Sequence, residues 1–309
     1  MPLDPSVARF LRLLGARGAG SADDDLAARR AGLAELMRFG GPPPPAQSED
    51  RRLRGSGGDL RVRIITPPGL AAGPGPGLVY FHGGGLVAGS IDTHDPLARA
   101  LAVSAGCRVV SVEYRLAPEA PFPAALDDAV YAVRQVRADP EGFGIDGSRF
   151  GVCGDSAGGT LAAAVCATLA AEAGPPLAMQ VLLCPILDHS RSSASRREYA
   201  SGHLVGQAIL DQDLALYLPR GTDPADPRVS PLRAADLRAL PPTLVHTAEC
   251  DPLRDEGHAY AERLGREGVA VSYTCHPGMI HLFYGLGAVI PYAHTALDRI
   301  GAEIRAGWR

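Results

Sequence analysis

The feature that most constrains the fold of this chain is the alternation of short apolar segments with alanine-rich segments at helical spacing. The apolar segments are rich in β-branched residues and are predicted as strands, with helices between most of them. Strands that are apolar throughout are typical of parallel sheets covered by helices on both faces. The sequence therefore predicts an α/β fold with a mostly parallel central sheet. Strands are expected at 60–65, 78–81, 108–113, 150–153, 180–184, 243–247 and 269–275, and helices at 96–105, 124–136 and 157–171.

Two segments interrupt this alternation. Residues 1–45 have an amphipathic helical pattern that stops at four consecutive prolines, Pro42 to Pro45. Residues 188–238 hold Ser, Arg and Asp clusters, Pro-rich turns and one helical stretch at 207–217. We expect both segments to form a helical cap over the carboxyl edge of the sheet, where ligands bind in open α/β folds. The α/β domain itself is expected to comprise residues 46–187 and 239–309.

Composition excludes several kinds of chemistry. The 309 residues contain no Lys and no Asn, so a P-loop lysine, a pyridoxal Schiff base and a Cys-His-Asn triad are all excluded. The net charge of −4 gives no electrostatic footprint for nucleic acid. We find no secretory-signal pattern and no apolar run long enough to span a bilayer. The six scattered cysteines are expected to be buried, reduced thiols in a cytoplasmic protein.

A short motif marks one strand–helix junction as a nucleophile site. The run Gly154-Asp155-Ser156-Ala157-Gly158 matches G-x-S-x-G, follows an apolar strand and opens an alanine-rich helix. The turn from strand to helix is so tight that the neighbours of the serine must be small. It holds the hydroxyl at the edge of the sheet, with a helix N-terminus behind it that favours developing negative charge. The motif predicts Ser156 as a nucleophile.

A glycine-rich loop follows an earlier strand and is predicted to complete this site. In the run His82-Gly83-Gly84-Gly85, the absence of side chains lets backbone N–H groups approach a ligand closely. A tetrahedral intermediate needs such donors around its oxyanion. We assign the N–H groups of Gly83, Gly84 and Ala157 to this oxyanion hole, with Gly85 and Asp155 as supporting motif residues. His82 is expected to anchor the loop as a structural histidine.

With these motifs, the sequence resembles the bacterial branch of the hormone-sensitive-lipase family of esterases. The resemblance covers about residues 78–284 and includes the runs Ser111–Glu119 and Phe122–Asp128. It implies an α/β-hydrolase fold and hydrolysis of short- to medium-chain carboxylic esters. No metal or organic cofactor is expected, since none of the nine histidines lies in a zinc-binding spacing. Members of the family often form homodimers through the last strand, here 269–275.

Chain order then predicts the partners of Ser156, because this fold places the acid and then the histidine after the nucleophile. Asp251 follows the next-to-last strand, and the resemblance indicates the same aspartate. His276 and His281 both qualify by position, and the resemblance of Met279–Phe283 to the family's histidine motif favours His281. That motif usually has Gly where Leu282 stands, a departure that concerns the shape of the loop. Two further acids, Asp255 and Glu256, are expected in solvated or capping roles on the next helix.

The same motifs leave the substrate open. The triad serves ester, amide and acetyl-group hydrolysis of a specialised metabolite equally well. A small-ligand receptor without catalysis is an alternative of a different class, because a fold does not guarantee activity. We expect apolar cap residues to line the acyl pocket, or to serve only in helix packing. These residues are Leu36, Met37, Phe39, Leu204, Leu214 and Tyr217.

Overall fold

The central sheet has eight strands and is mostly parallel, as the sequence predicts. The computed structural model describes residues 2–16, 25–55, 58–172 and 176–308, with the strands in the order β1-β2-β4-β3-β5-β6-β7-β8. β2 pairs antiparallel with β1 and β4, and the remaining neighbours are parallel. The strands are β1 (Gln47–Gly55), β2 (Gly58–Thr66), β3 (Gly75–Phe81), β4 (Arg108–Val112), β5 (Ile145–Asp155), β6 (Gln180–Leu183), β7 (Thr243–Cys250) and β8 (Val271–Ile280).

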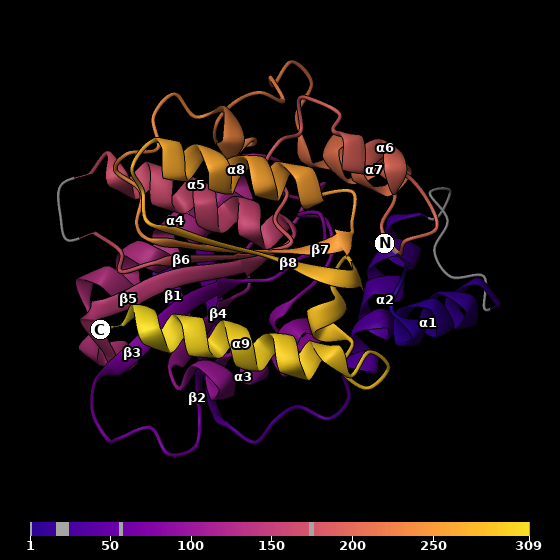
Figure 1. The fold of residues 1–309 in the computed structure, drawn as a ribbon. Coiled ribbons are helices and arrows are strands. Elements are labelled where there is room, and N and C mark those ends of the chain that lie inside the picture. The colour runs from indigo at the N-terminus through magenta and orange to yellow at the C-terminus, as the bar shows by residue number, and fades with distance from the viewer. Residues whose placement is uncertain (1, 17–24, 56–57, 173–175, 309) are drawn as a thin grey trace.

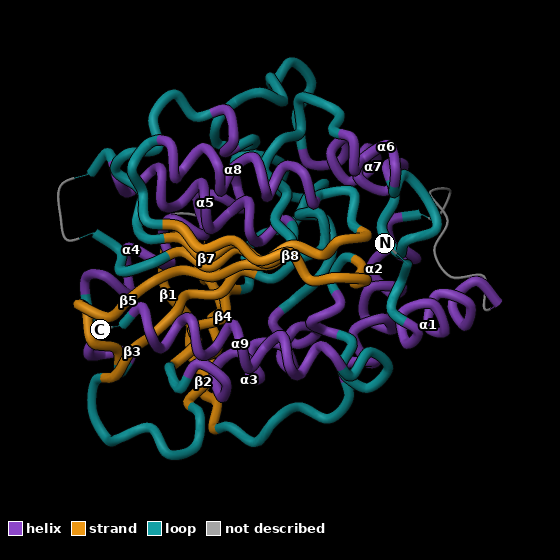
Figure 2. Tube along the Cα trace, viewed as in Figure 1, coloured by secondary structure: helices purple, strands orange, loops and turns teal. Residues whose placement is uncertain are grey.

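Helices cover both faces of this sheet. α4 (Ala124–Ala138), α5 (Ala157–Ala170) and α8 (Arg254–Arg266) lie on one face, and α3 (Ile91–Ala105) and α9 (Tyr292–Gly307) lie on the other (Figures 1 and 2). The remaining helices are α1 (Pro5–Ala16), α2 (Leu26–Met37), α6 (Ala194–Glu198) and α7 (Gln207–Tyr217). Short 3-10 turns occur at η1 (Arg38–Gly40), η2 (Glu141–Phe143), η3 (Pro231–Arg233) and η4 (Phe283–Gly285).

Strand β3 shows why the core strands are apolar throughout. Leu78 and Tyr80 belong to the hydrophobic cluster on the α3/α9 face, whereas Val79 and Phe81 belong to the cluster on the α4/α5/α8 face. All four are fully buried, because successive side chains of a strand point to opposite faces and both faces are covered here. The two clusters place the functional residues at the ends of rigid strands.

Some strands are longer than predicted, notably β5, which begins at Ile145, and β8, which ends at Ile280, and two further elements differ from the sequence prediction. Strand β1 was not expected, because its sequence QSEDRRLRG is mostly charged; it pairs with β2 as an edge strand, where polar side chains face water. Helix α3 begins at Ile91 and not at residue 96. Its start is a capping box in which the Ser90 hydroxyl accepts from the Thr93 N–H, and Pro96 lies inside the helix.

The two predicted cap segments lie together at one end of the sheet. In Figure 1, α1 and α2 lie beside α6 and α7 at the right-hand end, toward which β7 points. Helix α7 has the expected bounds, while residues 17–24 of the N-terminal segment lie outside the described residues. In the part of the chain that is described, no helix is both long enough and apolar enough to span a membrane.

Candidate active site

The junction of β5 and α5 is a sharp turn with Ser156 at its apex. Ser156 has φ 53° and ψ −120°, an uncommon conformation for a residue with a side chain. Its N–H donates to the Leu183 carbonyl at 2.8 Å, which fixes the turn against β6. A Cβ at Gly158 would lie 2.0 Å from the Phe81 carbonyl oxygen, and one at Gly154 would lie 2.1 Å from the Gly158 carbonyl oxygen. Backbone packing thus explains the small residues of the motif.

Ser156, His281 and Asp251 form a hydrogen-bonded chain at the carboxyl ends of β5, β8 and β7. The His281 Nε2 lies 2.9 Å from the Ser156 Oγ, and the His281 Nδ1 lies 2.8 Å from the Asp251 Oδ2. The other Asp251 oxygen accepts the Leu253 N–H at 2.8 Å. All three side chains are buried. This geometry allows the imidazole to take a proton from the hydroxyl while the carboxylate holds its other nitrogen.

The surroundings of His281 keep it basic. Burial is the largest single effect and would lower its pKa, but the charge and hydrogen bond of Asp251 and the charge of Asp155 together outweigh it, so the pKa is raised above the ordinary value of 6.5. The positive charge of Arg29 has the smallest of these effects and lowers the pKa. A buried histidine that neighbouring carboxylates keep basic is suited to act as a general base.

The second candidate histidine, His276, is not hydrogen-bonded to Ser156 or Asp251. It is part of β8, where its Nε2 lies 3.3 Å from the His246 Nδ1 and its Nδ1 lies 3.1 Å from the Tyr292 hydroxyl. Burial lowers its pKa to about 3, so it is neutral.

Leu282, which replaces the usual Gly, adopts φ 62°. Leu282 therefore adopts the left-handed backbone conformation that glycine would adopt more easily, and its side chain makes this conformation sterically unfavourable.

The glycine loop after β3 is held by Asp155. The Gly83 N–H donates to the Asp155 Oδ1 at 3.0 Å, and the Tyr80 hydroxyl donates to the same oxygen. This bond engages the N–H that the sequence assigned to the oxyanion hole. The N–H of Gly84, where φ is 123°, has no acceptor among the described residues, and neither has that of Ala157. We therefore assign Gly83 to anchoring the loop, a correction to its predicted role.

His82 also supports the loop. Its ring stacks on Tyr114 with centroids 4.3 Å apart, and its Nδ1 lies 2.8 Å from the Gly83 carbonyl oxygen. The Tyr114 hydroxyl donates to the His82 carbonyl at 2.6 Å. Burial lowers the pKa of His82 to about 3, so the ring is neutral. Its Nδ1 donates, because the Gly83 carbonyl oxygen can only accept. These contacts match the anchoring role expected of a structural histidine.

One cluster of potential metal ligands coincides with the triad. The ligand atoms of Cys184, Asp251 and His281 lie within 4.8 Å of one another. Burial raises the pKa of the Cys184 thiol well above 9, so it is protonated at neutral pH, whereas a metal requires the thiolate. Asp251 and His281 are already bonded to each other. This set does not fit a metal ion, and all six cysteines are free.

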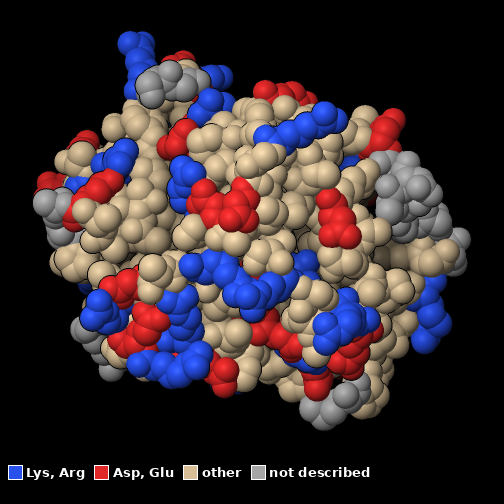
Figure 3. All heavy atoms as spheres, turned by 90° about the horizontal axis from the view of Figure 1, so that it is seen from above, with Lys and Arg blue, Asp and Glu red and all other residues tan. Residues whose placement is uncertain are grey.

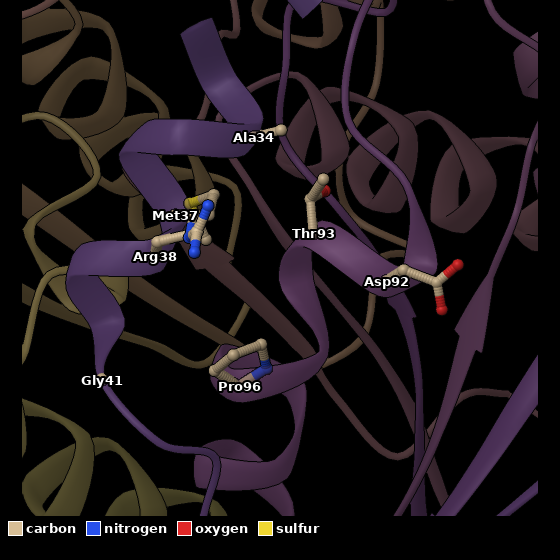
Figure 4. A pocket seen from close by; sticks show the side chains of 7 residues that line it. All are labelled: Ala34, Met37, Arg38, Gly41, Asp92, Thr93 and Pro96. Atoms are coloured by element: carbon tan, nitrogen blue, oxygen red, sulfur yellow. The ribbon is translucent and has the colours of Figure 1, made fainter. Parts of the chain in front are cut away.

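The predicted pocket residues occupy different surroundings. Met37 is buried against Gly285, and it borders a cavity of about 460 Å³ between α2 and α3 (Figure 4). Ser156 is not among the residues that line this cavity. Phe39 packs edge-on against Phe10, and Tyr217 packs edge-on against Phe122. Three of the predicted residues are half-buried, namely Leu36, Leu204 and Leu214. The backbone of Leu204 has φ 75°, and Leu214 borders a cavity of about 170 Å³.

Glu256 contradicts its predicted solvated or capping role. It is buried, accepts the backbone N–H groups of Leu187 and Asp188 at 3.1 and 2.7 Å, and pairs with Arg196 at 3.1 Å. Burial raises its pKa to about 7. Asp255, by contrast, accepts the Ser195 N–H at 2.7 Å, which is a capping contact to α6. No local pattern in the sequence distinguishes these adjacent acids, because their partners come from the distant cap segment.

Together, the open α/β sheet and the hydroxyl–imidazole–carboxylate chain at its carboxyl edge define the class of serine hydrolases built on such a sheet. The family profile described as alpha/beta hydrolase fold matches residues 78–285. The chain belongs to this family, in its hormone-sensitive-lipase-like branch, as the sequence motifs indicated.

Several characterised proteins are similar along most of the chain. The carboxylesterase NlhH of Mycobacterium tuberculosis is 40% identical, over 90% of this chain and 88% of its own. The ethyl acetate hydrolase of Pseudomonas putida is 39% identical, over 96% of each chain. An ester hydrolase from the metagenome of Lake Arreo, solved with a bipyridine phosphonate derivative, has a TM-score of 0.94 at 42% identity over 98% of both chains. The esterase of Pyrobaculum calidifontis has a TM-score of 0.92 at 36% identity over 99% of both.

Proposed function

We propose that this protein is a serine carboxylesterase in which Ser156 is the nucleophile, His281 the general base and acid, and Asp251 the residue that orients the imidazole. The observation that carries this proposal is the hydrogen-bonded chain of 2.9 and 2.8 Å that links the three side chains. Hydrolysis of carboxylic esters is also the activity named for relatives that span nearly the whole chain.

The reaction proceeds in two halves. His281 takes the proton of Ser156 as the hydroxyl attacks the ester carbonyl, and the N–H groups of Gly84 and Ala157 stabilise the oxyanion. The imidazolium then protonates the leaving alcohol, which leaves an acyl-enzyme on Ser156. Water activated by His281 attacks this intermediate, and the collapse of the second oxyanion releases the acid and restores the hydroxyl. Asp251 stabilises the imidazolium in both halves.

Hydrolysis of p-nitrophenyl acetate and butyrate tests this function directly. We expect turnover by the native chain and a loss of about 10⁴-fold or more in kcat for Ser156→Ala, since the nucleophile has no substitute. The variant must retain its circular dichroism spectrum and thermal transition. Binding of these esters without turnover would support the receptor alternative, and turnover of amides or of acetylated metabolites in preference to these esters would support the other hydrolases.

We also propose that residues 1–45 and 188–238 act as a cap that sets the acyl-chain preference, with short to medium chains favoured. Contacts of both segments with the glycine loop support this: Leu33 of α2 lies against Gly84, and Asp213 of α7 lies against Gly85. Deletion of the residues before Pro42 tests the cap. We expect a changed ratio of activities on acetate, butyrate and octanoate esters, and an unchanged ratio would refute a cap role.

The remaining proposals concern binding partners, cellular localisation and oligomeric state. Arginines and acidic side chains are interspersed on the face seen from above in Figure 3, which favours a small-molecule ester over nucleic acid as the partner. Six free cysteines favour the reducing cytoplasm as the location of the protein.

Because β8 is an edge strand, we propose that two copies of the chain form a homodimer through β8. Analytical ultracentrifugation of the purified chain tests this last point, and a monomer across the accessible concentration range would refute it.

A further inference from the structure

An ion pair between the two cap segments lies directly on the glycine loop. The Arg29 Nη2 of α2 lies 3.0 Å from the Asp213 Oδ2 of α7, and the Asp213 side chain is only 6% exposed. A Cβ built on Gly85 would lie 1.9 Å from that same carboxylate oxygen. Asp213 therefore occupies the space that a side chain at position 85 would take, beside the proposed oxyanion hole.

Each member of this pair has a buried polar atom without a hydrogen-bond partner. Among the described residues, neither the Asp213 Oδ1 nor the Arg29 Nε has a hydrogen-bond partner, although both atoms are shielded from solvent. Burying polar atoms unpaired costs free energy, and native proteins rarely tolerate it without a reason. The pair thus holds one free acceptor and one free donor, and its carboxylate lies against Gly85 of the glycine loop.

The neighbouring arginine shows that this situation is not general for α2. Arg30 donates through its Nε to the Val87 carbonyl at 2.8 Å and through its terminal nitrogens to Glu119 at 2.8 and 2.6 Å. It anchors α2 to the α/β domain with all of these donors engaged. Arg29 lies close enough to the triad for its charge to act on His281. Of these two adjacent arginines, the one with an unpaired buried nitrogen is therefore Arg29, which pairs with Asp213.

We propose that Arg29 and Asp213 form a recognition site for a hydroxyl group of the substrate, so that the preferred esters carry a hydroxyl on the acyl chain or on the alcohol. A hydroxyl donates one hydrogen bond, here to the Asp213 Oδ1, and accepts another, here from the Arg29 Nε. It therefore satisfies both unused atoms at once, whereas an unsubstituted chain leaves them unpaired. This inference rests on the proposed esterase function and names the substrate class of that site.

Matched ester pairs test the proposal on the native chain. Ethyl 3-hydroxybutyrate against ethyl butyrate places the hydroxyl on the acyl side, and glycerol 1-monobutyrate against propyl butyrate places it on the alcohol side. We expect kcat/KM to favour the hydroxyl ester at least about tenfold in one of the pairs, as a hydrogen bond to a charged group allows. Ratios near one in both pairs would overturn the proposal. Turnover of p-nitrophenyl butyrate is measured in parallel, so loss of the esterase function itself is seen separately.

Variants separate recognition from a purely structural role. Asp213→Leu removes the acceptor, and we expect the ratio of kcat/KM between the hydroxyl ester and the unsubstituted ester to fall to about one. A structural clasp would instead lower kcat/KM for both members of the pair equally and leave their ratio unchanged, which would contradict the proposal. Glu119→Gln, which weakens the fully bonded Arg30 anchor, is the matched control and should keep the native ratio.

A second substitution covers the event that Asp213→Leu does not fold. Asp213→Asn keeps the shape of the side chain but removes its charge, and charged hydrogen bonds are roughly twice as strong as neutral ones. We expect a several-fold smaller hydroxyl preference, with the thermal transition close to that of the native chain. A folded Asp213→Asn variant with the full native preference would overturn the assignment.

Discussion

The catalytic edge of the sheet and the cap above it are built in different ways. At the edge, Ser156, His82 and Asp155 are fixed by contacts so close that glycine is required beside them. A Cβ at Gly158 would lie 2.0 Å from the Phe81 carbonyl oxygen, and one at Gly83 would lie 2.3 Å from the Asp155 carboxylate. In the cap, α2 is attached through side chains: Arg30 pairs with Glu119, Arg29 pairs with Asp213, and Leu33 and Met37 are buried.

This difference separates the residues that set the catalytic geometry from those that set the choice of substrate. The geometry needed for catalysis is set by close packing around glycines, which tolerates almost no substitution. The choice of substrate depends on side chains from segments far apart in the chain, which can be exchanged while the sheet stays intact. Four sets of variants probe this contrast.

The largest effect is expected at the acid of the triad. Asp251→Asn keeps the shape of the side chain but favours the wrong imidazole tautomer, so kcat on p-nitrophenyl butyrate should fall by about 10⁴-fold. Asp255→Asn is the matched control, because Asp255 lies four residues away and caps α6 through the Ser195 N–H. Its kcat should stay within about threefold of native, as is usual away from the reacting groups. Equal losses in both variants would contradict the assignment.

A smaller loss is expected in the glycine loop. Gly84→Ala places a Cβ 2.3 Å from the Ala88 carbonyl oxygen and displaces the free Gly84 N–H, so kcat should fall by about 10²- to 10³-fold. Gly202 in the cap also has positive φ, at 78°, but a Cβ there meets nothing within 4 Å. Gly202→Ala should therefore cost only about 1 kcal/mol of unfolding free energy and leave kcat unchanged. A similar loss of kcat in both would show that backbone strain alone causes the effect.

The pH dependence tests the coupling of His281 to Asp251. Because neutral His281 is the base and its pKa is raised, kcat/KM should rise about tenfold per pH unit at low pH and level off above 6.5. The same shift contributes folding stability that is complete below pH 6.5 and is lost as pH rises through the folded pKa. In Asp251→Asn, burial is opposed only by the charge of Asp155, the weakest of the effects that raise this pKa, and the inflection should move to lower pH. An unchanged inflection in that variant would refute the coupling.

The smallest effect is expected in the cap. Leu214 is half-buried beside a cavity of about 170 Å³, so Leu214→Ala should change the octanoate-to-butyrate ratio of kcat/KM a few-fold. Phe39→Ala, which removes a contact with Phe10, should lower thermal stability with little effect on that ratio. The reverse pattern would show that Phe39 and not Leu214 borders the acyl chain.

The sequence predicted the edge of the sheet well, because each feature there has a local steric cause. The glycines around Ser156 and the order of strands brought Ser156, Asp251 and His281 into one hypothesis, and the structure places these side chains within hydrogen-bonding distance. His276 could be separated from His281 only by resemblance, since both follow the same run of apolar residues. The structure separates them by their hydrogen-bond partners.

The rest depended on contacts between distant segments, which no local pattern encodes. The Gly83 N–H was assigned to the oxyanion hole because nothing in the sequence shows that Asp155 reaches it. Glu256 looked like its neighbour Asp255, yet it is buried against Arg196 of the cap. The Arg29–Asp213 pair, separated by 184 residues, was missed for the same reason.

Covalent labelling of Ser156 tests the central claim most directly. Incubation with diethyl p-nitrophenyl phosphate, followed by intact mass and peptide mapping, should show one phosphoryl adduct, carried by Ser156, with parallel loss of activity. Labelling of His281→Ala should be slower by several orders of magnitude, because the hydroxyl then has no base. Loss of activity without an adduct on Ser156, or an adduct on another residue, would contradict the account.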